Sequence, residues 1–163
     1  MDYTKNPYRN SENEKYDIWE LLVRRDFDAF LKGDWGIIKD DFIEDDFFGL
    51  DCKYSDNPDN WCLTFPDLMT YRNEWERQSR EFRKNKFAED PRLALYRSVV
   101  LENISIKGGF ASVHKYFNGE IALQEADDLK LKWVSIFLLK KFEGNWKIKG
   151  FTGYIRLHND CKR

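Results

Sequence analysis

Apolar residues fall on both faces of one stretch near the end of the chain. From Trp133 to Leu139 every position except Ser135 is apolar, so an extended strand here is hydrophobic front and back. Gly144-Asn145 then separates this strand from a second alternating run that opens at Trp146, which predicts a hairpin. Because neither face suits water, we expect helices of the same chain to cover one face, and a further layer or a second subunit to cover the other.

Helical spacing dominates the first half of the chain. A capping-box sequence at Ser11–Glu14 predicts the start of a helix that ends at Gly33, and Asp34 predicts the cap of a short second helix. A long third helix is predicted to begin at Pro66 and to stop at Asp90-Pro91. The apolar stripe of the first helix is Ile18, Leu22, Val23, Phe27, Phe30 and Leu31.

Strand patterns follow and alternate with turn signals. A short strand at Phe47–Leu50 precedes a turn-rich surface loop at 51–64. The pattern then predicts strands over Leu93–Ile106 and Phe110–Phe117, and Asn118-Gly119 predicts a turn. Together with the final hairpin this gives four antiparallel strands after the helices, which predicts an α+β fold with helices on one face of a strongly bent sheet.

Length and charge narrow the class of protein. The 163 residues predict one domain over 11–158, between a flexible or loosely docked arm at 1–10 and a tail at 159–163. No run reaches the ~20 apolar residues of a membrane span. The polar start lacks a signal peptide, so we expect a cytoplasmic protein without membrane contact. A net charge of −2 predicts no nucleic-acid partner.

The three cysteines have no paired spacing. Cys52, Cys62 and Cys161 are odd in number, and we expect free thiols rather than a Cys52–Cys62 disulfide. Two distant histidines make a metal site unexpected, and the chain has neither a phosphate-binding glycine loop nor a Gly-x-Ser-x-Gly elbow. No cofactor is predicted.

Two motifs resemble one known superfamily. Phe27–Trp35 (FDAFLKGDW) resembles the helix, Gly-Asp, helix opening of the nuclear transport factor 2-like superfamily, also called ketosteroid-isomerase-like or SnoaL-like. Phe142–Ile148 (FEGNWKI) resembles its closing hairpin, so the resemblance covers nearly all of 12–157. It implies a cone-shaped, bent antiparallel sheet wrapped around helices, a cystatin-like roll, with a pocket at the open end. It also implies frequent homodimers through the outer sheet face.

The resemblance does not extend to the steroid isomerase site. Counted from the motifs, the position of the tyrosine donor falls on Asp26, and that of the base falls on Leu50, one residue before Asp51. The position of the protonated acid falls near Ile136, beside Ser135. Steroid isomerase chemistry is therefore not expected, and the fold alone does not define a reaction.

Three side chains are candidates for acid–base catalysis. Asp51 follows an apolar strand, where partial burial would make it a usable base, although it equally suits an Asx cap of the following loop. His114 shares a strand face with Tyr116, and this polar strip would serve proton transfer if it faced inward; the opposite parity is more apolar. Tyr154 on the last strand is a candidate donor, or closes the core.

Aromatic residues are candidates for the walls of a ligand pocket. The candidate ligand-binding residues are Trp61, Tyr71, Trp75, Tyr96, Tyr116 and Thr152. Core packing explains the aromatic ones equally well. Two hypotheses remain: a pocket for a small apolar or aromatic ligand, with or without isomerase, dehydratase or cyclase chemistry, and a non-catalytic dimerisation or adaptor module. The first predicts an enclosed cavity, and the second predicts a pocket filled by the protein's own aromatic side chains.

Overall fold

The computed structural model describes residues 1–10 and 13–157, so Ser11, His158, Cys161 and the tail at 159–163 lie outside the described residues. Its helices are α1 (Glu14–Trp19), a π-helical turn (Glu20–Arg25), α2 (Asp26–Lys32), α3 (Leu68–Arg83) and α4 (Pro91–Ser98), with 3-10 turns at Trp35–Ile37, Lys39–Asp41 and Pro58–Asn60. Its strands are β1 (Phe48–Asp51), β2 (Cys62–Phe65), β3 (Val99–Lys107), β4 (Phe110–Ile121), β5 (Leu129–Phe142) and β6 (Asn145–Arg156).

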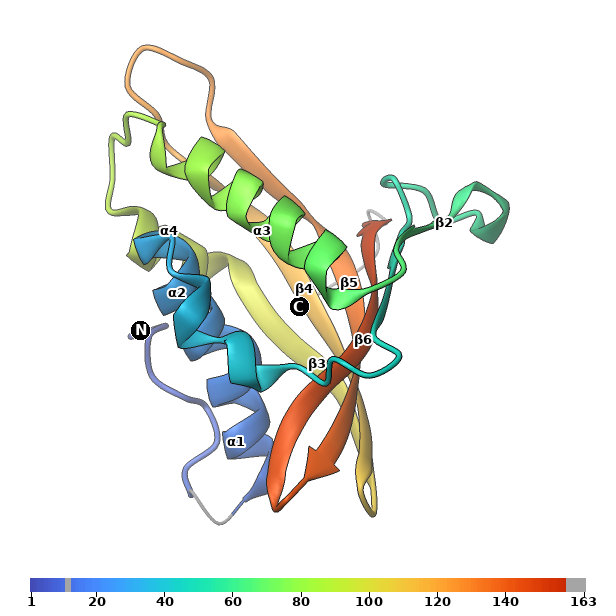
Figure 1. Ribbon diagram of the computed structural model, residues 1–163. Helices are drawn as coiled ribbons and strands as arrows, with labels where there is room; N and C mark the ends of the chain where they lie inside the picture. Colours follow the sequence, from blue (N-terminus) through green and yellow to red (C-terminus); the bar gives the residue numbers. More distant parts are fainter. Residues whose placement is uncertain (11–12, 158–163) are drawn as a thin grey trace.

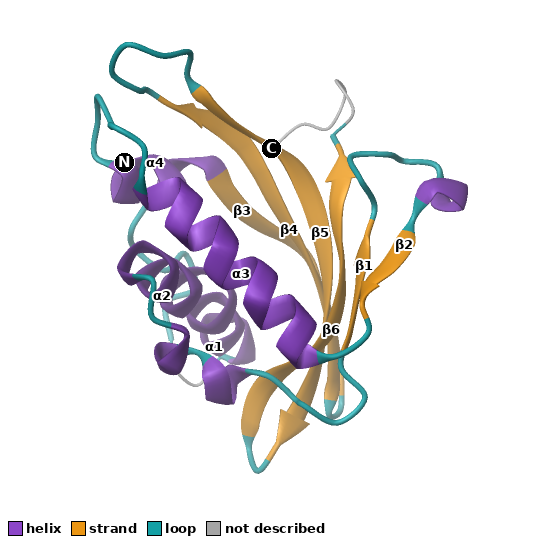
Figure 2. Cartoon of the chain, turned by 45° about the horizontal axis from the view of Figure 1, so that its top comes forward, coloured by secondary structure: helices purple, strands orange, loops and turns teal. Residues whose placement is uncertain are grey.

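One bent sheet carries the helices on one side. The six strands follow the order β2-β1-β6-β5-β4-β3, and all neighbours are antiparallel except β1 and β6, which are parallel. In Figures 1 and 2, α1, α2 and α3 lie against one face of the sheet. Residues 52–65, which follow β1 and include β2, project from the body, and we call them the projecting arm. The predicted α+β class is confirmed, but the parallel pairing of β1 and the strand β2 were not predicted.

The core lies between the helices and the concave face of the sheet. The predicted stripe is correct, because Ile18, Leu22 and Phe27 are at most 2% exposed. Val113 on β4 and Leu139 on β5 meet them from the sheet. The N-terminal segment 1–10 docks on this helix layer, since Asn6 donates to the Tyr16 carbonyl oxygen and Arg24 donates to the Thr4 carbonyl oxygen.

The ends of the helices are partly as predicted. Gly33 ends α2 with φ +67°, a conformation that costs glycine little, as expected. The cap of α1 is Asn13, whose side chain accepts from the Lys15 amide at 2.9 Å. The cap of α3 is Asp67, which accepts from the Thr70 amide at 2.8 Å, so Pro66 precedes the helix rather than opening it.

Asp90-Pro91 begins a helix instead of ending one, which corrects the prediction. The Asp90 carboxylate accepts from the amides of Arg92 (2.8 Å) and Leu93 (3.4 Å), and Pro91 takes the first helical position, where no amide hydrogen is needed. The segment expected to open a long strand is therefore α4, and β3 starts only at Val99.

Asn118-Gly119 is not a turn, and β4 continues through it to Ile121. A Cβ on Gly119 would lie 2.7 Å from the Ser98 Cβ. The glycine therefore lets the end of α4 approach the strand, and its role is close packing rather than chain reversal. The hairpin predicted before Trp146 is present, but its turn is Glu143-Gly144 rather than Gly144-Asn145: φ is positive at Glu143 (51°) and Gly144 (83°), and Asn145 already belongs to β6.

The two faces of β5 have different surroundings. Helices cover the inner face, as predicted, and none of the described helices lies over the outer face (Figure 2). There Val134 is 9% exposed, while Ile136 and Leu138 are half-buried. Cross-strand neighbours form rows on this face, for example His114, Ile136 and Thr152.

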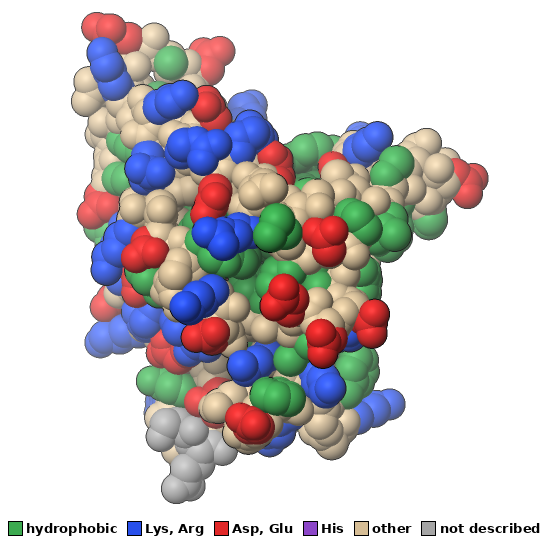
Figure 3. All heavy atoms as spheres, in the orientation of Figure 1, with side chains coloured by type: hydrophobic (Ala, Val, Ile, Leu, Met, Phe, Trp, Pro, Cys, Tyr) green, Lys and Arg blue, Asp and Glu red, His purple; other side chains and the backbone are tan. Residues whose placement is uncertain are grey.

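The described surface mixes both signs of charge. Figure 3 shows Lys and Arg side chains interspersed with Asp and Glu, and hydrophobic side chains on the arm that carries β2. The arm exposes Tyr54 and Leu63. Of its cysteines, Cys52 is buried and Cys62 exposed, and both are free thiols. No described helix is long and apolar enough to cross a membrane.

Candidate functional site

A cavity of about 370 Å³ lies between α3 and the inner face of β4, β5 and β6. Its volume falls in the range that holds small organic ligands. Half of the residues that line it are aromatic: Phe27, Phe30, Tyr54, Tyr71, Trp75, Phe82, Phe117, Trp133, Phe137, Phe151 and Tyr154. The cavity therefore suits a flat and largely apolar molecule.

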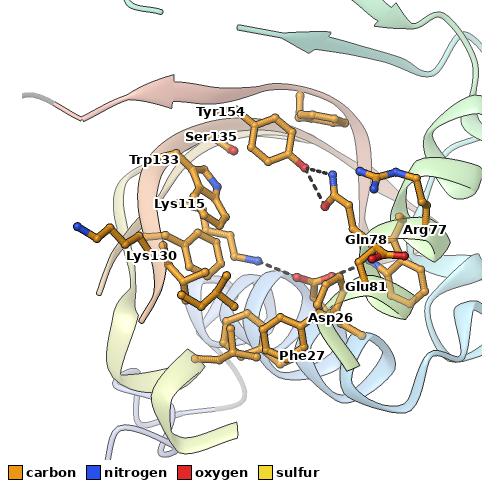
Figure 4. A pocket seen from close by; sticks show the side chains of 18 of the residues that line it. Asp26, Phe27, Arg77, Gln78, Glu81, Lys115, Lys130, Trp133, Ser135 and Tyr154 are labelled. Atoms are coloured by element: carbon orange, nitrogen blue, oxygen red, sulfur yellow. Dashed lines mark hydrogen bonds and ion pairs between the residues drawn. The ribbon is translucent and has the colours of Figure 1, made fainter. Parts of the chain in front are cut away.

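A buried ion pair crosses this apolar cavity (Figure 4). The Lys115 side chain, on the inner face of β4, is 4% exposed, and its Nζ lies 2.9 Å from Oδ2 of Asp26 at the start of α2. Nζ also donates to the Leu22 carbonyl oxygen. The rings of Phe27 and Phe117 have their centroids 5.2 and 5.3 Å from Nζ. Taking such a pair out of water is costly, and the additional hydrogen bond of Nζ partly offsets the cost.

The π-helical turn next to Asp26 sets this geometry. The Asp26 amide, which follows the turn, donates to the Val23 carbonyl oxygen, and the Leu22 carbonyl oxygen accepts from Lys115. Three successive residues of the turn, Leu21, Leu22 and Val23, are at most 2% exposed. Single π-helical turns within helices often occur at functional sites, because they open the regular hydrogen-bond ladder.

Neutral hydrogen-bonding groups occupy another part of the wall. The Tyr154 hydroxyl lies 3.0 Å from Nε2 and 3.2 Å from Oε1 of Gln78 on α3 (Figure 4). Burial raises the pKa of the Tyr154 phenol, so it stays protonated at neutral pH. Burial likewise raises the pKa of Tyr71. The Trp75 indole donates to Oδ1 of Asp26 at 3.4 Å, so α3 also helps to orient the carboxylate.

Ser135 completes the floor of the cavity beside Lys115. The two residues are register partners on β4 and β5, so their side chains stand next to each other on the inner face. Ser135 is 6% exposed and lines the cavity, as its position in Figure 4 shows. Its hydroxyl makes no hydrogen bond to any residue that the structure describes.

Asp51 lies outside the cavity, so the structure does not place it as a base there. It ends β1 on the arm, and its Oδ1 accepts from the Lys53 amide at 2.8 Å. This is the Asx cap that the sequence allowed as the alternative. The reason is topological: β1 lies between β2 and β6, away from β4 and β5, and its end leads into the projecting arm.

His114 also lies away from the cavity. Ala111, Val113, Lys115 and Phe117 face inward, so His114 faces the outer side of β4. Its Nδ1 lies 3.3 Å from Nδ2 of Asn103. Burial lowers the pKa of His114, and nearby Glu102 opposes this. The more apolar parity is thus the inner one.

The predicted wall residues divide between the cavity and other places. Tyr71 and Trp75 line the cavity. Trp61 does not line the cavity and instead anchors the projecting arm, by donating to the Ser55 carbonyl oxygen at 2.9 Å. Tyr96 is 1% exposed, packs edge-on against Phe27 and belongs to the core. The remaining two candidates, Tyr116 and Thr152, stand in the rows of the outer sheet face.

Three polar residues of the site were given no role from the sequence. Lys115 had a signal, because it is a charged residue at the buried parity of an alternating strand. Asp26 and the neighbourhood of Ser135 correspond to positions of the steroid isomerase site. They were given no role because neither residue matches the chemistry of that site. Among the described residues, no group of three His, Cys, Asp or Glu side chains is placed to hold a metal ion.

Comparisons with known proteins identify the fold only. No family model and no curated protein matches the chain. Solved structures do match. One is an NTF2-like protein of unknown function from Shewanella baltica OS155, 19% identical with a TM-score of 0.52 over 90% of this chain and 96% of that one.

Two further structures agree with the first. An NTF2-like protein from Cytophaga hutchinsonii is 16% identical, with a TM-score of 0.54 over 89% of this chain and 99% of that one. An NTF2-like superfamily protein from Salmonella enterica is 11% identical, with a TM-score of 0.55 over 90% and 93%. The chain therefore has the nuclear transport factor 2-like fold, as the two sequence motifs predicted.

Proposed function

We propose that this chain, whose fold is nuclear transport factor 2-like, binds a small, flat and largely apolar molecule in the cavity beneath α3. The open volume of about 370 Å³ among aromatic walls carries the proposal. An adaptor module without a ligand would have this space filled by its own aromatic side chains. The rings instead leave room of the size that small-molecule sites provide.

The polar groups of the cavity supply orientation. Lys115, Asp26 and the Tyr154–Gln78 pair stand among the aromatic rings of the wall, and a few placed polar groups among apolar ones are the usual composition of a selective small-molecule site. Of the three residues considered for catalysis, Tyr154 alone reaches the cavity. Any acid–base step would therefore involve Asp26 and Lys115 rather than Asp51 and His114.

A neutral dye tests whether the cavity accepts a ligand. N-phenyl-1-naphthylamine fluoresces strongly in apolar sites, and we expect saturable enhancement with the intact protein. Leu129 lines the cavity, so Leu129→Trp should fill it and weaken binding by at least about ten-fold, or ~1.4 kcal/mol. Lys132→Trp is the control, because this exposed residue lies on the same strand outside the cavity. Absence of enhancement, or equal binding by both variants, would refute the proposal.

Homodimerisation and a cytoplasmic location complete the proposal. The outer face of β5 presents the half-buried Ile136 and Leu138 beside Val134, and a second copy of this surface would cover them. The free thiols of Cys52 and Cys62 are consistent with a reducing compartment.

A further inference from the structure

We infer that one end of the sheet docks reversibly on membranes whose surface is rich in anionic lipids. The surface concerned consists of Lys107, Phe110, Lys140, Phe142 and Lys147, and we call it the hairpin-tip surface. It lies outside the cavity and does not depend on the proposed ligand. The expectation of no membrane contact rested on properties of the whole chain, a net charge of −2 and the lack of a long apolar run, and neither describes this local surface.

Two phenylalanine rings are exposed at neighbouring turns of the sheet. Phe110 follows the turn between β3 and β4 and is 47% exposed, and Phe142 precedes the turn between β5 and β6 and is 42% exposed. In Figures 1 and 2 both turns lie at the same end of the molecule. A Cβ at Gly108 or Gly144, one in each turn, would meet nothing within 4 Å among the described residues. The two turns therefore protrude, and a flat surface can meet both rings at once.

The three lysines stand beside these rings. Register pairing places them and Phe110 side by side across β3, β4, β5 and β6. Ala111 and Leu139 of the next row are buried against the helices, so the lysine row faces the outer side of the sheet. With neighbouring strands about 4.8 Å apart, the row spans roughly 14 Å. Nζ of Lys147 lies 5.3 Å from the centroid of the Phe142 ring, so charge and ring are adjacent.

The positive charge of this row is not neutralised by the described part of the chain. None of its three lysines forms an ion pair with a described carboxylate, whereas Lys141, on the inner side of β5, is paired with Glu14. Of the acids nearby, Asp41 is held by Arg25 at 2.9 Å, and Glu143 is a single exposed charge in the turn. Three lysines against one glutamate leave two positive charges at this end.

This combination of charge and shape fits an anionic bilayer better than other partners. Lysines near such a surface contribute roughly five-fold in affinity each, and phenylalanine rings enter the boundary between headgroups and acyl chains. A nucleic acid strand or an acidic peptide is usually held in a groove, whereas these turns are convex. A second copy of the chain, meeting the same surface in a two-fold contact, would set lysines against lysines. The cytoplasmic leaflet is the anionic one, in keeping with the proposed location.

Vesicle sedimentation tests the inference. The intact protein is mixed with vesicles of phosphatidylcholine alone, or of equal parts of phosphatidylcholine and phosphatidylglycerol. We expect weak, saturable binding to the anionic vesicles, and binding at least about ten-fold weaker to phosphatidylcholine. About 1 M salt should release most of the bound protein, because screening then acts within ~3 Å.

The contribution of charge is tested by removing the lysine row. The triple variant Lys107→Gln/Lys140→Gln/Lys147→Gln should weaken binding to anionic vesicles on the order of 100-fold. A matched control removes the same charge from exposed lysines at and after the ends of α2 and α3, and it should bind within about three-fold of the intact protein, because these charges lie beyond the screening length. Its substitutions are Lys32→Gln, Lys84→Gln and Lys86→Gln.

The contribution of the rings is tested separately. Phe110→Ser/Phe142→Ser should weaken binding to anionic vesicles about ten-fold, because two half-exposed rings lose their contact with lipid. Leu63→Ser/Met69→Ser is the control: these apolar side chains are 57% and 69% exposed elsewhere on the molecule, and their loss should change binding less than about two-fold. Circular dichroism and light scattering should show the fold and the mass of the intact protein in every variant.

The outcomes separate a membrane from other partners. If neither kind of vesicle binds, if both bind equally, or if each control weakens binding as much as its matched variant, the inference is wrong. It is also wrong if the lysine variant changes the mass of the particle, which would make this surface a subunit contact, or if single-stranded RNA binds more tightly than anionic vesicles. Dye binding in the cavity stands or falls independently of these results.

Discussion

The Lys115–Asp26 pair is asymmetric in its exposure to water. The Lys115 side chain is 4% exposed and the Asp26 side chain 32%. Loss of the carboxylate would therefore leave a deeply buried ammonium whose only remaining described acceptor is the Leu22 carbonyl oxygen. Loss of the ammonium would leave a carboxylate that water can reach. The two halves of the pair are not equivalent for stability.

This asymmetry predicts unequal costs. We expect Asp26→Asn to lower the free energy of unfolding by about 3 kcal/mol and Lys115→Met by about 1–2 kcal/mol. The double variant should cost less than the sum, because it leaves no unpaired buried charge. Urea unfolding followed by circular dichroism measures all three. Additive losses would show that the two residues do not act as a pair.

Single residues are where sequence reasoning was weakest. Asp51 was attractive because it follows an apolar strand, but periodicity does not say that the strand leads out of the body. Lys115 lies on the more apolar parity of its strand, opposite to His114, and the alternating pattern alone gives a single charged residue there no role. Its partner is 89 positions away in the chain, and pairing over such a distance depends on the packing of helix on sheet.

At the scale of elements, α4 and β4 fit together through one glycine. Gly119 lies in the strand where Ser98 ends the helix, and Ser98 is 1% exposed with its hydroxyl donating to the Ala94 carbonyl oxygen. A side chain at position 119 would push the helix away from the sheet. The close approach, rather than a turn, explains this glycine.

Gly119→Ala should therefore destabilise the protein. We expect a loss of about 1–3 kcal/mol from overpacking, with part of it recovered when Ser98→Gly removes the opposing side chain. Gly109→Ala is the control: a Cβ there meets nothing closer than the Lys141 Cβ at 3.9 Å. Thermal and urea unfolding give the differences. An unchanged stability of Gly119→Ala would mean that the contact relaxes without cost.

Elements with strong periodicity were predictable, whereas turn and cap residues were predictable only where they allow a single interpretation. The first helix, its end at Gly33 and the hairpin at Glu143 and Gly144 follow local rules. Asp90-Pro91 obeys a local rule as well, but the same dipeptide suits both the end of one helix and the start of the next. Which of the two applies depends on whether the following residues pack as helix or strand, which is a tertiary question.

At the scale of the molecule, the outer sheet face remains without a described cover. Its rows combine polar and apolar side chains, such as Tyr116, Val134 and Ile155 across three strands. Neighbouring side chains shield one another, so Ile136 and Leu138 are half-buried already in one chain. The overall architecture was the most predictable level, because hydrophobic pattern and element order restrict it together. In the proposed homodimer, the second cover of β5 would come from the other subunit.

A homodimer through this face predicts a particle of twice 19.7 kDa. Light scattering behind size-exclusion chromatography measures the mass at micromolar concentration. Ile136→Glu should yield monomers, because a charge at the centre of a self-complementary face meets its own copy. Leu63→Glu, at an exposed position on the arm, is the control and should leave the dimer intact. A wild-type protein with the mass of one chain, 19.7 kDa, would contradict the dimer.

The π-helical turn between α1 and α2 also restricts changes in chain length. One extra residue per turn offsets the helical phase by about 100°. Deleting a residue from Glu20–Arg25 would straighten the segment and swing Ile18 and Trp19 out of the hydrophobic interior, together with the docked first ten residues. Deletions among natural relatives should therefore avoid these six positions. They should instead occur in the projecting arm at 53–60, where the loss of one residue disturbs no buried stripe.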